Sequence, residues 1–318
     1  MLSRIADSLF WLARYKERAE DTARILDVNY HMLLEQSESA YRVRWTPLIS
    51  MAGEEERFHQ FYQEANSQTV FDFLAFRSDN PNSIMQCISK ARENARIIRD
   101  RISREMWEDI NGLYHSVTAF SAAGALTGGP HRFCNTVKFG CHRFHGVTDA
   151  TLPHDDGWQF LKIGWSLERA EMTARPVALQ YQQLLEGPIQ AGAPDNYQWM
   201  AVLKSVGAYE NYRREYQSPI EPERVAEMLM LHAQHPRSVR FSMTELQAGL
   251  RAISGTEAGS YANEAERLTG KLLESLCYDT VEDIFRRGLH SYVGNILTKC
   301  HAIGADIERC YFCYGVVA

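Results

Sequence analysis

The chain has 318 residues, of which 45% are hydrophobic and 23% are charged, so it has the composition of an ordinary globular protein with a large core. Its net charge of −6 argues against a nucleic-acid surface as the main function. No run of about 18 apolar residues is present to span a membrane. Seven cysteines without a recognisable secretion signal favour a reducing compartment. We therefore expect a cytoplasmic protein whose partners are neither nucleic acid nor membrane.

Apolar residues recur at helical spacing along almost the whole chain, and alternating β-branched runs are scarce, so the sequence predicts an all-α fold. The expected helices cover residues 4–36, 47–64, 68–76, 82–118, 156–185, 196–216, 222–233, 242–253 and 258–310, the last with at least one break. Ser83 is placed to cap a helix, Pro222 suits a first helical turn, and Gly128-Gly129-Pro130 stops the element before it. The stretch from Gly187 to Pro194 has the composition of a loop.

One octet occurs twice in the chain. Glu17-Arg18-Ala19-Glu20-Asp21-Thr22-Ala23-Arg24 returns 151 residues later as Glu168-Arg169-Ala170-Glu171-Met172-Thr173-Ala174-Arg175, with seven of eight positions identical. Residues between Val70 and Ile84 are matched 155 residues later, between Val225 and Val239. A small drift in offset is what a duplicated unit with short insertions gives. We predict one domain, 1–318, that is a helical bundle of two duplicated halves, 1–150 and 151–318, about a pseudo-two-fold axis.

Both octets lie in helices with apolar residues on nearly every side, so their charges are expected to be buried or to line a cavity. Glu20 and Arg24 form an i,i+4 pair in the favoured order, with the acid nearer the N-terminus. Pro176 stands where the first copy has Ile25. Because proline interrupts helical hydrogen bonding, we expect the second helix to end or kink after Arg175 and the two copies to differ in geometry.

Two interpretations of the charges stay open. If the halves meet, each Glu can face the Arg of the other copy in a structural salt-bridge network. Alternatively, Arg binds a carboxylate or phosphate and Glu binds an ammonium group in a paired pocket. A third charged segment, around residues 92–96, forms either a solvated face or part of the same site. The candidate residues for binding or for an ion-pair network are Arg14, Glu17, Arg18, Glu20, Arg24, Arg92, Glu93, Asn94, Arg96, Glu168, Arg169, Glu171 and Arg175.

Several segments, in this order, resemble one known family. They are Phe10-Trp11-Leu12-Ala13-Arg14-Tyr15 with the first octet, Ala91-Arg92-Glu93-Asn94-Ala95-Arg96 to Trp107, Gly157-Trp158-Gln159-Phe160 with the second octet, and Pro236-Arg237-Ser238-Val239-Arg240-Phe241. Together they resemble the bacterial alpha-E family, an α-helical domain named for its Glu-Arg motif, over essentially the whole chain. The resemblance implies a companion of circularly permuted ATP-grasp ligases, to which such proteins are sometimes fused, and of transglutaminase-like peptidases encoded nearby.

The sequence contains neither a Gly-rich phosphate loop ending in Lys-Ser/Thr nor a dinucleotide fingerprint, so we expect no cofactor and assign any ATP chemistry to the partner. The leading hypothesis is an accessory helical protein of an amide- or peptide-forming ligase system. It would present the paired Glu-Arg site to the substrate or to the ligase. The alternative is an enzyme acting on an anionic or zwitterionic amino-acid or peptide substrate, with Glu17 or Glu168 as general base and arginine as anion binder.

Three patterns bear on metals. His131, Cys134, Cys141 and His145 have ligand types and spacings that zinc accepts, but no zinc-ribbon pattern surrounds them. Cys310-x-x-Cys313 has redox-motif spacing without a βαβ context, which favours two buried apolar cysteines. The Glu-x-x-Glu pairs of the octets lack histidine, and the adjacent arginines compete for the carboxylates. We therefore expect no metal site.

Overall fold

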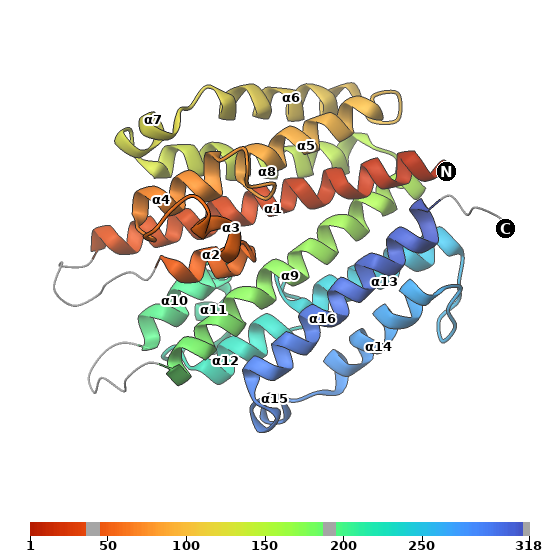
Figure 1. The fold of residues 1–318 in the computed structure, drawn as a ribbon. Helices are drawn as coiled ribbons and strands as arrows, with labels where there is room; N and C mark the ends of the chain where they lie inside the picture. The colour runs from red at the N-terminus through yellow and green to blue at the C-terminus, as the bar shows by residue number, and fades with distance from the viewer. Residues whose placement is uncertain (36–44, 187–194, 314–318) are drawn as a thin grey trace. The chain divides into compact units, whose positions relative to one another are not determined.

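The computed structural model describes residues 1–35, 45–186 and 195–313, and the predicted loop at 187–194 lies outside these ranges. Over the described residues all regular structure is helical and no strand occurs (Figure 1), which confirms the all-α prediction. Within the same ranges, no helix combines the length and the apolar character that crossing a membrane requires.

The chain divides into two compact units. Unit 1 consists of residues 1–14 and 153–318, and unit 2 consists of residues 15–152. Helix α1 (Ser3–Glu35) begins in unit 1 and continues into unit 2. The first fourteen residues therefore pack with the second half of the sequence.

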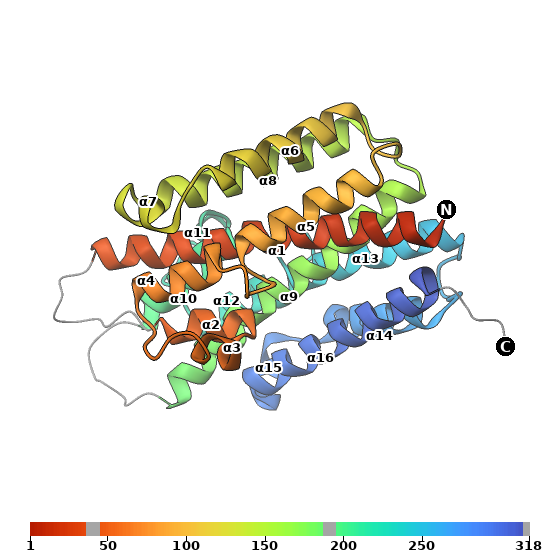
Figure 2. The same ribbon diagram turned by 45° about the horizontal axis from the view of Figure 1, so that its top comes forward.

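Unit 2 is built around α8 and its neighbours. Besides α1, its helices are α2 (Thr46–Ala52), α3 (Glu55–His59), α4 (Ser67–Phe71), the π-helix η1 (Asp72–Phe76), α5 (Ile84–Ile97), α6 (Arg104–Thr118), α7 (Ala122–Thr127) and α8 (Pro130–Thr151). Helix α6 lies along α8 and also contacts α5 (Figures 1 and 2). Gly140 permits this approach, because a Cβ there would clash with a methyl group of Leu113. The ring of Phe133 packs against Phe71, Phe76 and Phe120 in the core.

Unit 1 is centred on a long helix, α9. Its elements are α9 (Asp156–Glu186), α10 (Asp195–Ser205), α11 (Tyr209–Tyr216), α12 (Pro222–Ala226), the π-helix η2 (Glu227–Leu231), α13 (Val239–Ser254), α14 (Glu264–Tyr278), α15 (Val281–Arg287), α16 (Leu289–Ile307) and the π-helix η3 (Glu308–Phe312). Helix α9 packs against α13 and α16, and α14 packs against both of these. A Cβ on Gly164 would lie 2.5 Å from the carbonyl oxygen of Phe10, so the first turns of α1 approach the α9 backbone directly.

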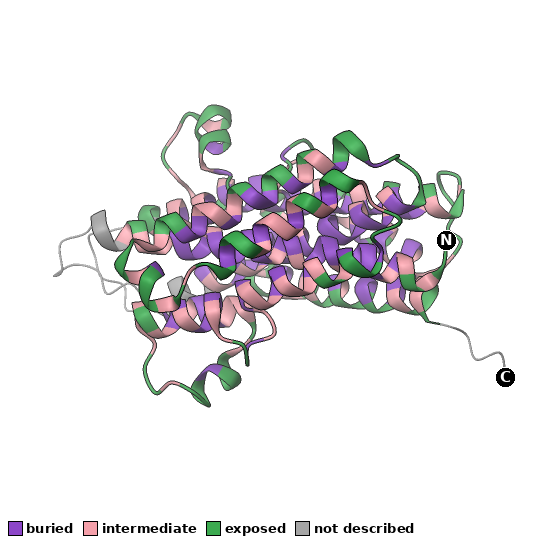
Figure 3. Cartoon of the chain, turned by 90° about the horizontal axis from the view of Figure 1, so that it is seen from above, coloured by how far each residue is buried: buried purple, intermediate pink, exposed green. Residues whose placement is uncertain are grey.

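Burial follows the amphipathic pattern of the helices. Figure 3 shows helices that carry a buried stripe on one side and an exposed stripe on the other. The octet segments of α1 and α9 differ from this pattern, because most of their residues, charged ones included, are buried. The expectation that the charges of these helices are buried is therefore met for the glutamates.

The predicted helix starts at Ser83 and Pro222 are confirmed. The Ser83 hydroxyl accepts a hydrogen bond from the backbone N–H of Gln86 at the start of α5, and Pro222 opens α12. Several long predicted helices are divided, however. The one expected at 82–118 breaks between α5 and α6, where Ser103 caps α6.

Helix α8 was absent from the predicted set. Its buried face consists of Phe133, Val137, Cys141 and Phe144 at helical spacing. Two glycines, a histidine-rich composition and several threonines give this segment low intrinsic helix propensity, so its stability comes from tertiary packing.

Pro176 does not end the second octet helix, which was one of the two expected outcomes, and the predicted range 156–185 agrees with the observed α9. Helix α9 continues ten residues beyond the proline, to Glu186. An internal proline removes one hydrogen bond and costs about 3 kcal/mol. The buried residues Ala174, Val177 and Ala178 surround it, and packing of these residues offsets that cost.

Similar elements recur in the two units at nearly constant spacing. Helix α4 and η1 cover residues 67–76, and α12 and η2 cover residues 222–231, 155 positions later. Gly129 precedes α8 with φ of 93°, and Gly288 precedes α16 with φ of 86°, 159 positions later. Both glycines adopt a conformation that side chains disfavour.

Candidate functional site

The first octet forms a buried cluster in unit 2, which we call the unit 2 carboxylate cluster: Lys16, Glu17, Glu20, Arg24 and His142. Glu17 and Glu20 are 0% and 1% exposed, and the Lys16 side chain between them is 2% exposed. The Lys16 ammonium lies 2.8 Å from Glu17 Oε2 and 3.6 Å from Glu20 Oε2. Arg24 Nη2 donates to Glu20 Oε1 at 2.7 Å, and His142 Nε2 lies 2.9 Å from the same oxygen.

The second octet forms the unit 1 carboxylate cluster: Arg14, Glu168, Glu171, Arg175 and His301. Arg14 Nε donates to Glu168 Oε2 at 2.7 Å, and its Nη2 donates to Glu171 Oε1 at 3.1 Å. Arg175 Nη2 and His301 Nε2 lie 3.4 and 3.8 Å from Glu171 Oε2. Arg14 also stacks over Trp11, with its guanidinium carbon 5.1 Å from the ring centroid.

The two clusters contain the same parts. Each has two buried glutamates one helical turn apart, a buried cation that contacts both, an arginine four residues after the second glutamate, and a histidine from another helix. The predicted i,i+4 pair of Glu20 with Arg24 is confirmed. Burying a carboxylate is costly unless it is paired and hydrogen-bonded, and the buried cations meet that condition.

The arginines of the octets lie closer to the surface than the glutamates. Arg18 and Arg169 are half-buried. Arg18 Nη1 donates to Asn82 Oδ1 at 2.5 Å, and its guanidinium lies over the Tyr15 ring. Arg24 and Arg175 keep 17% and 23% of their side chains exposed. The Glu-Arg motif therefore directs acid inward and guanidinium outward.

The third charged segment lies on α5 and has partners of its own. Glu93 and Arg96 are both exposed and bind each other, and this hydrogen bond lowers the pKa of the Glu93 carboxyl. Arg92 Nε donates to Asn111 Oδ1 on α6 at 2.7 Å and lies over the Tyr114 ring. Asn94 is half-buried on the same helix. The structure thus brings Arg92 to α6 and pairs Glu93 with Arg96, apart from the unit 2 carboxylate cluster.

The cysteines of the predicted zinc set are unsuited to metal binding. Cys134 and Cys141 are fully buried, and burial raises the pKa of each thiol well above its usual value, which disfavours the thiolate form that binds a metal. The Cys141 thiol donates to the Lys16 carbonyl oxygen at 3.6 Å. His131 faces Asp27 instead, with Nδ1 2.7 Å from Oδ1.

The C-terminal cysteine pair also differs from expectation. Cys310 and Cys313 are exposed free thiols, so the prediction of two buried cysteines is wrong. They lie in and just after the π-helix η3, in which Phe312 packs against Phe10.

Sequence reasoning missed three members of the clusters: Lys16, His142 and His301. Lys16 precedes the first octet, but the second octet is preceded by Leu167, so the repeat alone hides this cation. His142 and His301 lie on α8 and α16, 159 positions apart. That spacing continues the drift of the repeat from 151 to 155, and extending the comparison of the halves to their last helices would have found them.

The comparison with known protein families shows to which family this chain belongs. The model of the alpha-E family, described as a predicted alpha-helical domain with a conserved ER motif, matches residues 1–312. The chain belongs to the alpha-E family. Two of its Glu-Arg dipeptides, Glu17-Arg18 and Glu168-Arg169, form the centres of the carboxylate clusters of this alpha-E protein.

Curated relatives of this alpha-E chain include uncharacterized proteins of Mycobacterium bovis and of two strains of Mycobacterium tuberculosis. Each is 23% identical over 330 aligned residues, which cover 96% of this chain and 36% of the relative. The chain thus spans little more than a third of the length of the relatives it matches. No solved structure matches the chain.

Proposed function

We propose that this alpha-E chain is an accessory helical protein of an amide- or peptide-forming system, with a circularly permuted ATP-grasp ligase as its partner. On this proposal, its Glu-Arg helices present a paired charged site to the ligase or to the substrate. One observation carries the proposal: Glu17 and Glu168 are fully buried, and each binds a buried cation. The choice of the ligase as the partner rests on the family resemblance.

The burial of these glutamates disfavours the enzyme alternative. A general base must reach the proton that it removes, within hydrogen-bond distance of a bound substrate. Glu17 holds the ammonium of Lys16, and Glu168 holds the guanidinium of Arg14, with both carboxylates at 0% exposure. Either carboxylate would have to leave its cation before it could accept a proton from a substrate.

The outward-facing arginines define the chemistry of the presented site. Arg24 and Arg175 are held by glutamates that are 1% and 2% exposed, while their own side chains reach the surface. A guanidinium fixed in this way is suited to a carboxylate or a phosphate, because it presents N–H groups in a planar fork. We therefore propose an anionic group of the substrate, or acidic side chains of the ligase, as the bound chemistry.

We also propose that the two units descend from one duplicated unit. The support is the recurrence of the octet, of a π-helix 155 positions after η1, and of a left-handed glycine before the last long helix of each unit. The matching histidines of the two clusters extend this correspondence to α8 and α16. The pseudo-two-fold axis expected from the sequence stays a prediction.

The length of the relatives supports a function within a larger assembly. In each mycobacterial relative the matched region occupies 36% of a longer chain, so the module occurs joined to other segments. A transglutaminase-like peptidase is a second partner that the resemblance suggests. The seven free cysteines are consistent with a cytoplasmic location, which is also part of this proposal.

Co-elution with the ligase tests the proposal. The chain is mixed with the circularly permuted ATP-grasp ligase of the same genome, and size-exclusion elution and the rate of ADP release are measured. We expect co-elution and a changed ligase rate. The double variant Arg24→Ala/Arg175→Ala should lose both effects. Arg96→Ala, which removes an exposed arginine of α5, is the matched control and should keep them.

Two results would count against the proposal. Failure to associate, with the ligase rate unchanged by adding the chain, would sink the accessory role. The enzyme alternative would gain if the isolated chain turned over an amino-acid or peptide substrate, and if Glu17→Gln and Glu168→Gln folded and bound that substrate but abolished turnover.

A further inference from the structure

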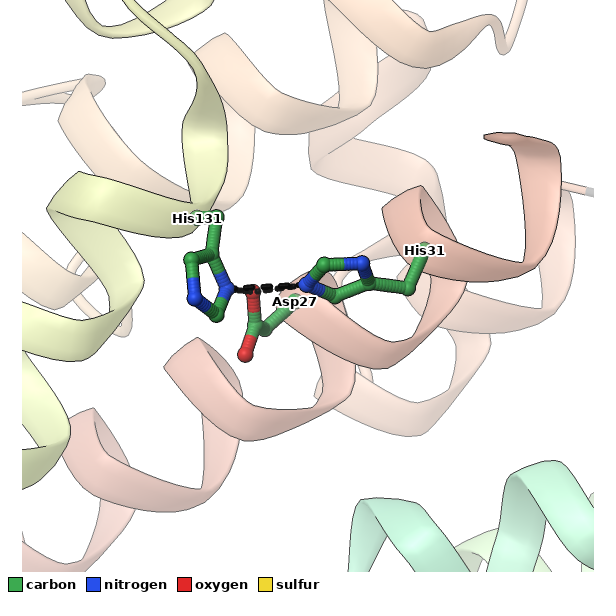
Figure 4. A group of neighbouring side chains, drawn as sticks. All are labelled: Asp27, His31 and His131. Atoms are coloured by element: carbon green, nitrogen blue, oxygen red, sulfur yellow. Dashed lines mark hydrogen bonds and ion pairs between the residues drawn. The ribbon is translucent and has the colours of Figure 1, made fainter. Parts of the chain in front are cut away.

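A second polar cluster lies in unit 2, outside the carboxylate clusters. It consists of Asp27 and His31 on α1 and His131 in the first turn of α8, and their side chains point toward one another (Figure 4). Asp27 is 5% exposed, whereas His31 and His131 are exposed. One buried carboxylate therefore meets two imidazoles at the surface.

Three atoms that can donate a lone pair to a metal lie close together in this cluster. His131 Nδ1 lies 2.7 Å from Asp27 Oδ1 and 2.8 Å from His31 Nε2, and His31 Nε2 lies 3.6 Å from Asp27 Oδ1. A single proton on His131 Nδ1 can serve both of its short contacts only as a bifurcated hydrogen bond. A metal ion at the point of convergence would instead accept all three lone pairs.

The separations fit a first-row transition ion. Ligand bonds of about 2.0–2.2 Å place neighbouring N and O ligands roughly 3.0–3.4 Å apart in octahedral or tetrahedral geometry. The three separations of 2.7, 2.8 and 3.6 Å bracket this range. The two imidazole rings are inclined at 78°, so their nitrogens approach one point from different directions.

Neighbouring groups fix the candidate ligands. Lys138 Nζ lies 2.5 Å from the second carboxylate oxygen of Asp27, which leaves Oδ1 to face the histidines. The side-chain amide of Asn135 lies 2.6 Å from His131 Nε2. With a metal on Nδ1, the Nε2–H would donate to the oxygen of that amide once the amide is turned over, an outer contact that metal-bound histidines commonly make.

We propose that Asp27, His31 and His131 form a binding site for a divalent first-row transition ion, with the remaining coordination positions open to water or to a ligand. Two histidines and one carboxylate are the donor set that Zn²⁺ and Fe²⁺ accept. The site replaces the zinc set suggested by the sequence, sharing only His131 with it, and it departs from the expectation that the chain binds no metal.

Zinc titration of the chain tests the site. The affinity tag is removed, the protein is treated with a chelator and dialysed, and Zn²⁺ alone is titrated by calorimetry. We expect one ion per chain. His31→Ala and His131→Ala should lose that binding, and Asp27→Asn should weaken it at least tenfold. Asn135→Ala should weaken it about 10-fold or more, because the hydrogen bond that orients the His131 ring is lost.

His115→Ala is the matched control, because His115 is an exposed histidine on α6 of the same unit. It should bind Zn²⁺ like the parent chain. Circular dichroism checks that the variants fold, which the exposure of both histidines favours. The proposal is overturned if no ion binds. It is also overturned if binding survives in the three ligand variants, for example because the exposed thiols of Cys310 and Cys313 hold the metal.

Discussion

The two carboxylate clusters differ in where their buried cation comes from. In unit 2, Lys16 lies on α1 beside the glutamates that it binds, and His142 reaches the cluster from α8. In unit 1, the glutamates lie on α9 and the cation, Arg14, comes from α1. The same octet therefore gives the same pair of buried acids in two settings. In unit 2 a cation of the same helix binds the acids, whereas in unit 1 the acids join α9 to α1.

The largest effect expected from this difference is at Arg14. Arg14→Met leaves Glu168 and much of Glu171 buried without their main cation, and breaking a buried pair in this way costs about 3–5 kcal/mol. Urea denaturation at pH 7 measures the free energy of unfolding. Arg96→Met, which breaks the exposed pair with Glu93, is the control and should leave the free energy of unfolding nearly unchanged.

A second variant separates lost charge pairing from lost packing. In Arg14→Met/Glu168→Gln/Glu171→Gln, the acids become neutral amides, and much of the lost stability should return because the two residues that Arg14 binds no longer carry a buried charge. If Arg14→Met costs no more than Arg96→Met, the unit 1 cluster does not join its helices by charge.

Lys16→Met should have the second-largest effect. It removes a cation that contacts both glutamates, but Arg24 and His142 still contact Glu20, so the expected cost is about 2–3 kcal/mol. The same denaturation experiment measures it, with Lys16→Arg as the variant that keeps the charge. A cost above that of Arg14→Met would reverse the ranking of the two clusters.

The next-largest expected loss of stability comes from the close packing of α1 against α9 in unit 1. Gly164→Ala places a methyl group 2.5 Å from the Phe10 carbonyl oxygen, and such overpacking costs about 2 kcal/mol. Gly146→Ala in α8 of unit 2 is the matched control, because nothing lies within 4 Å of its added Cβ. It should stabilise by up to about 1 kcal/mol through helix propensity. Equal changes in Tm for the two variants would show that α1 and α9 are not in close contact.

Most of the helices and the burial of the octet glutamates follow from the sequence alone. Apolar periodicity marks long helices such as α1 and α9 directly. Capping residues mark where helices begin, as Ser83 does for α5. Helix α8 does not follow, because its residues favour helix only in contact with their neighbours. Periodicity predicts the full length of α9 at 156–185, whereas the local penalty of Pro176 predicts an end or a kink. The helix does not end there, because packing outweighs that penalty.

The sequence also does not reveal which cations pair with the buried glutamates, for a different reason. Lys16 looks like one more surface lysine beside an acid, and no local pattern shows that it is 2% exposed. Arg14 was among the candidates, but its pairing with Glu168 joins residues 154 positions apart. Such long-range partners depend on how helices pack, which periodicity does not encode.

The smallest expected change in stability comes from a position that holds a titrating histidine in unit 1 and an asparagine in unit 2. His235 precedes Pro236 in unit 1, and Asn80 precedes Pro81 at the position 155 residues earlier in unit 2. Both side chains are buried, at 4% and 0% exposure. Asn80 is satisfied, because Nδ2 donates to the Phe73 carbonyl and Oδ1 accepts from the Asn82 N–H. Burial, together with nearby His232 and Arg237, lowers the pKa of His235 to about 4.

This difference predicts a pH dependence that belongs to unit 1. Because the pKa of His235 is lower in the folded chain than in the unfolded chain, the unfolded state binds an extra proton between pH 6.5 and pH 4. Folding stability is therefore fully present above that window and falls as the pH falls, by about 1 kcal/mol between pH 7 and pH 5.5. His235→Asn, which installs the residue of unit 2, should remove this contribution from the pH profile of unfolding.

The reciprocal variant makes the comparison complete. Asn80→His should add a similar acid sensitivity to unit 2, because the histidine would be buried before a proline in the corresponding turn. Urea denaturation of the parent chain and both variants at pH 7 and pH 5.5 supplies the measurement, and differences between chains cancel the other titrating groups. If His235→Asn leaves the pH profile unchanged, His235 binds its proton as readily in the folded chain as in the unfolded chain, and the two turns are then equivalent in their response to pH.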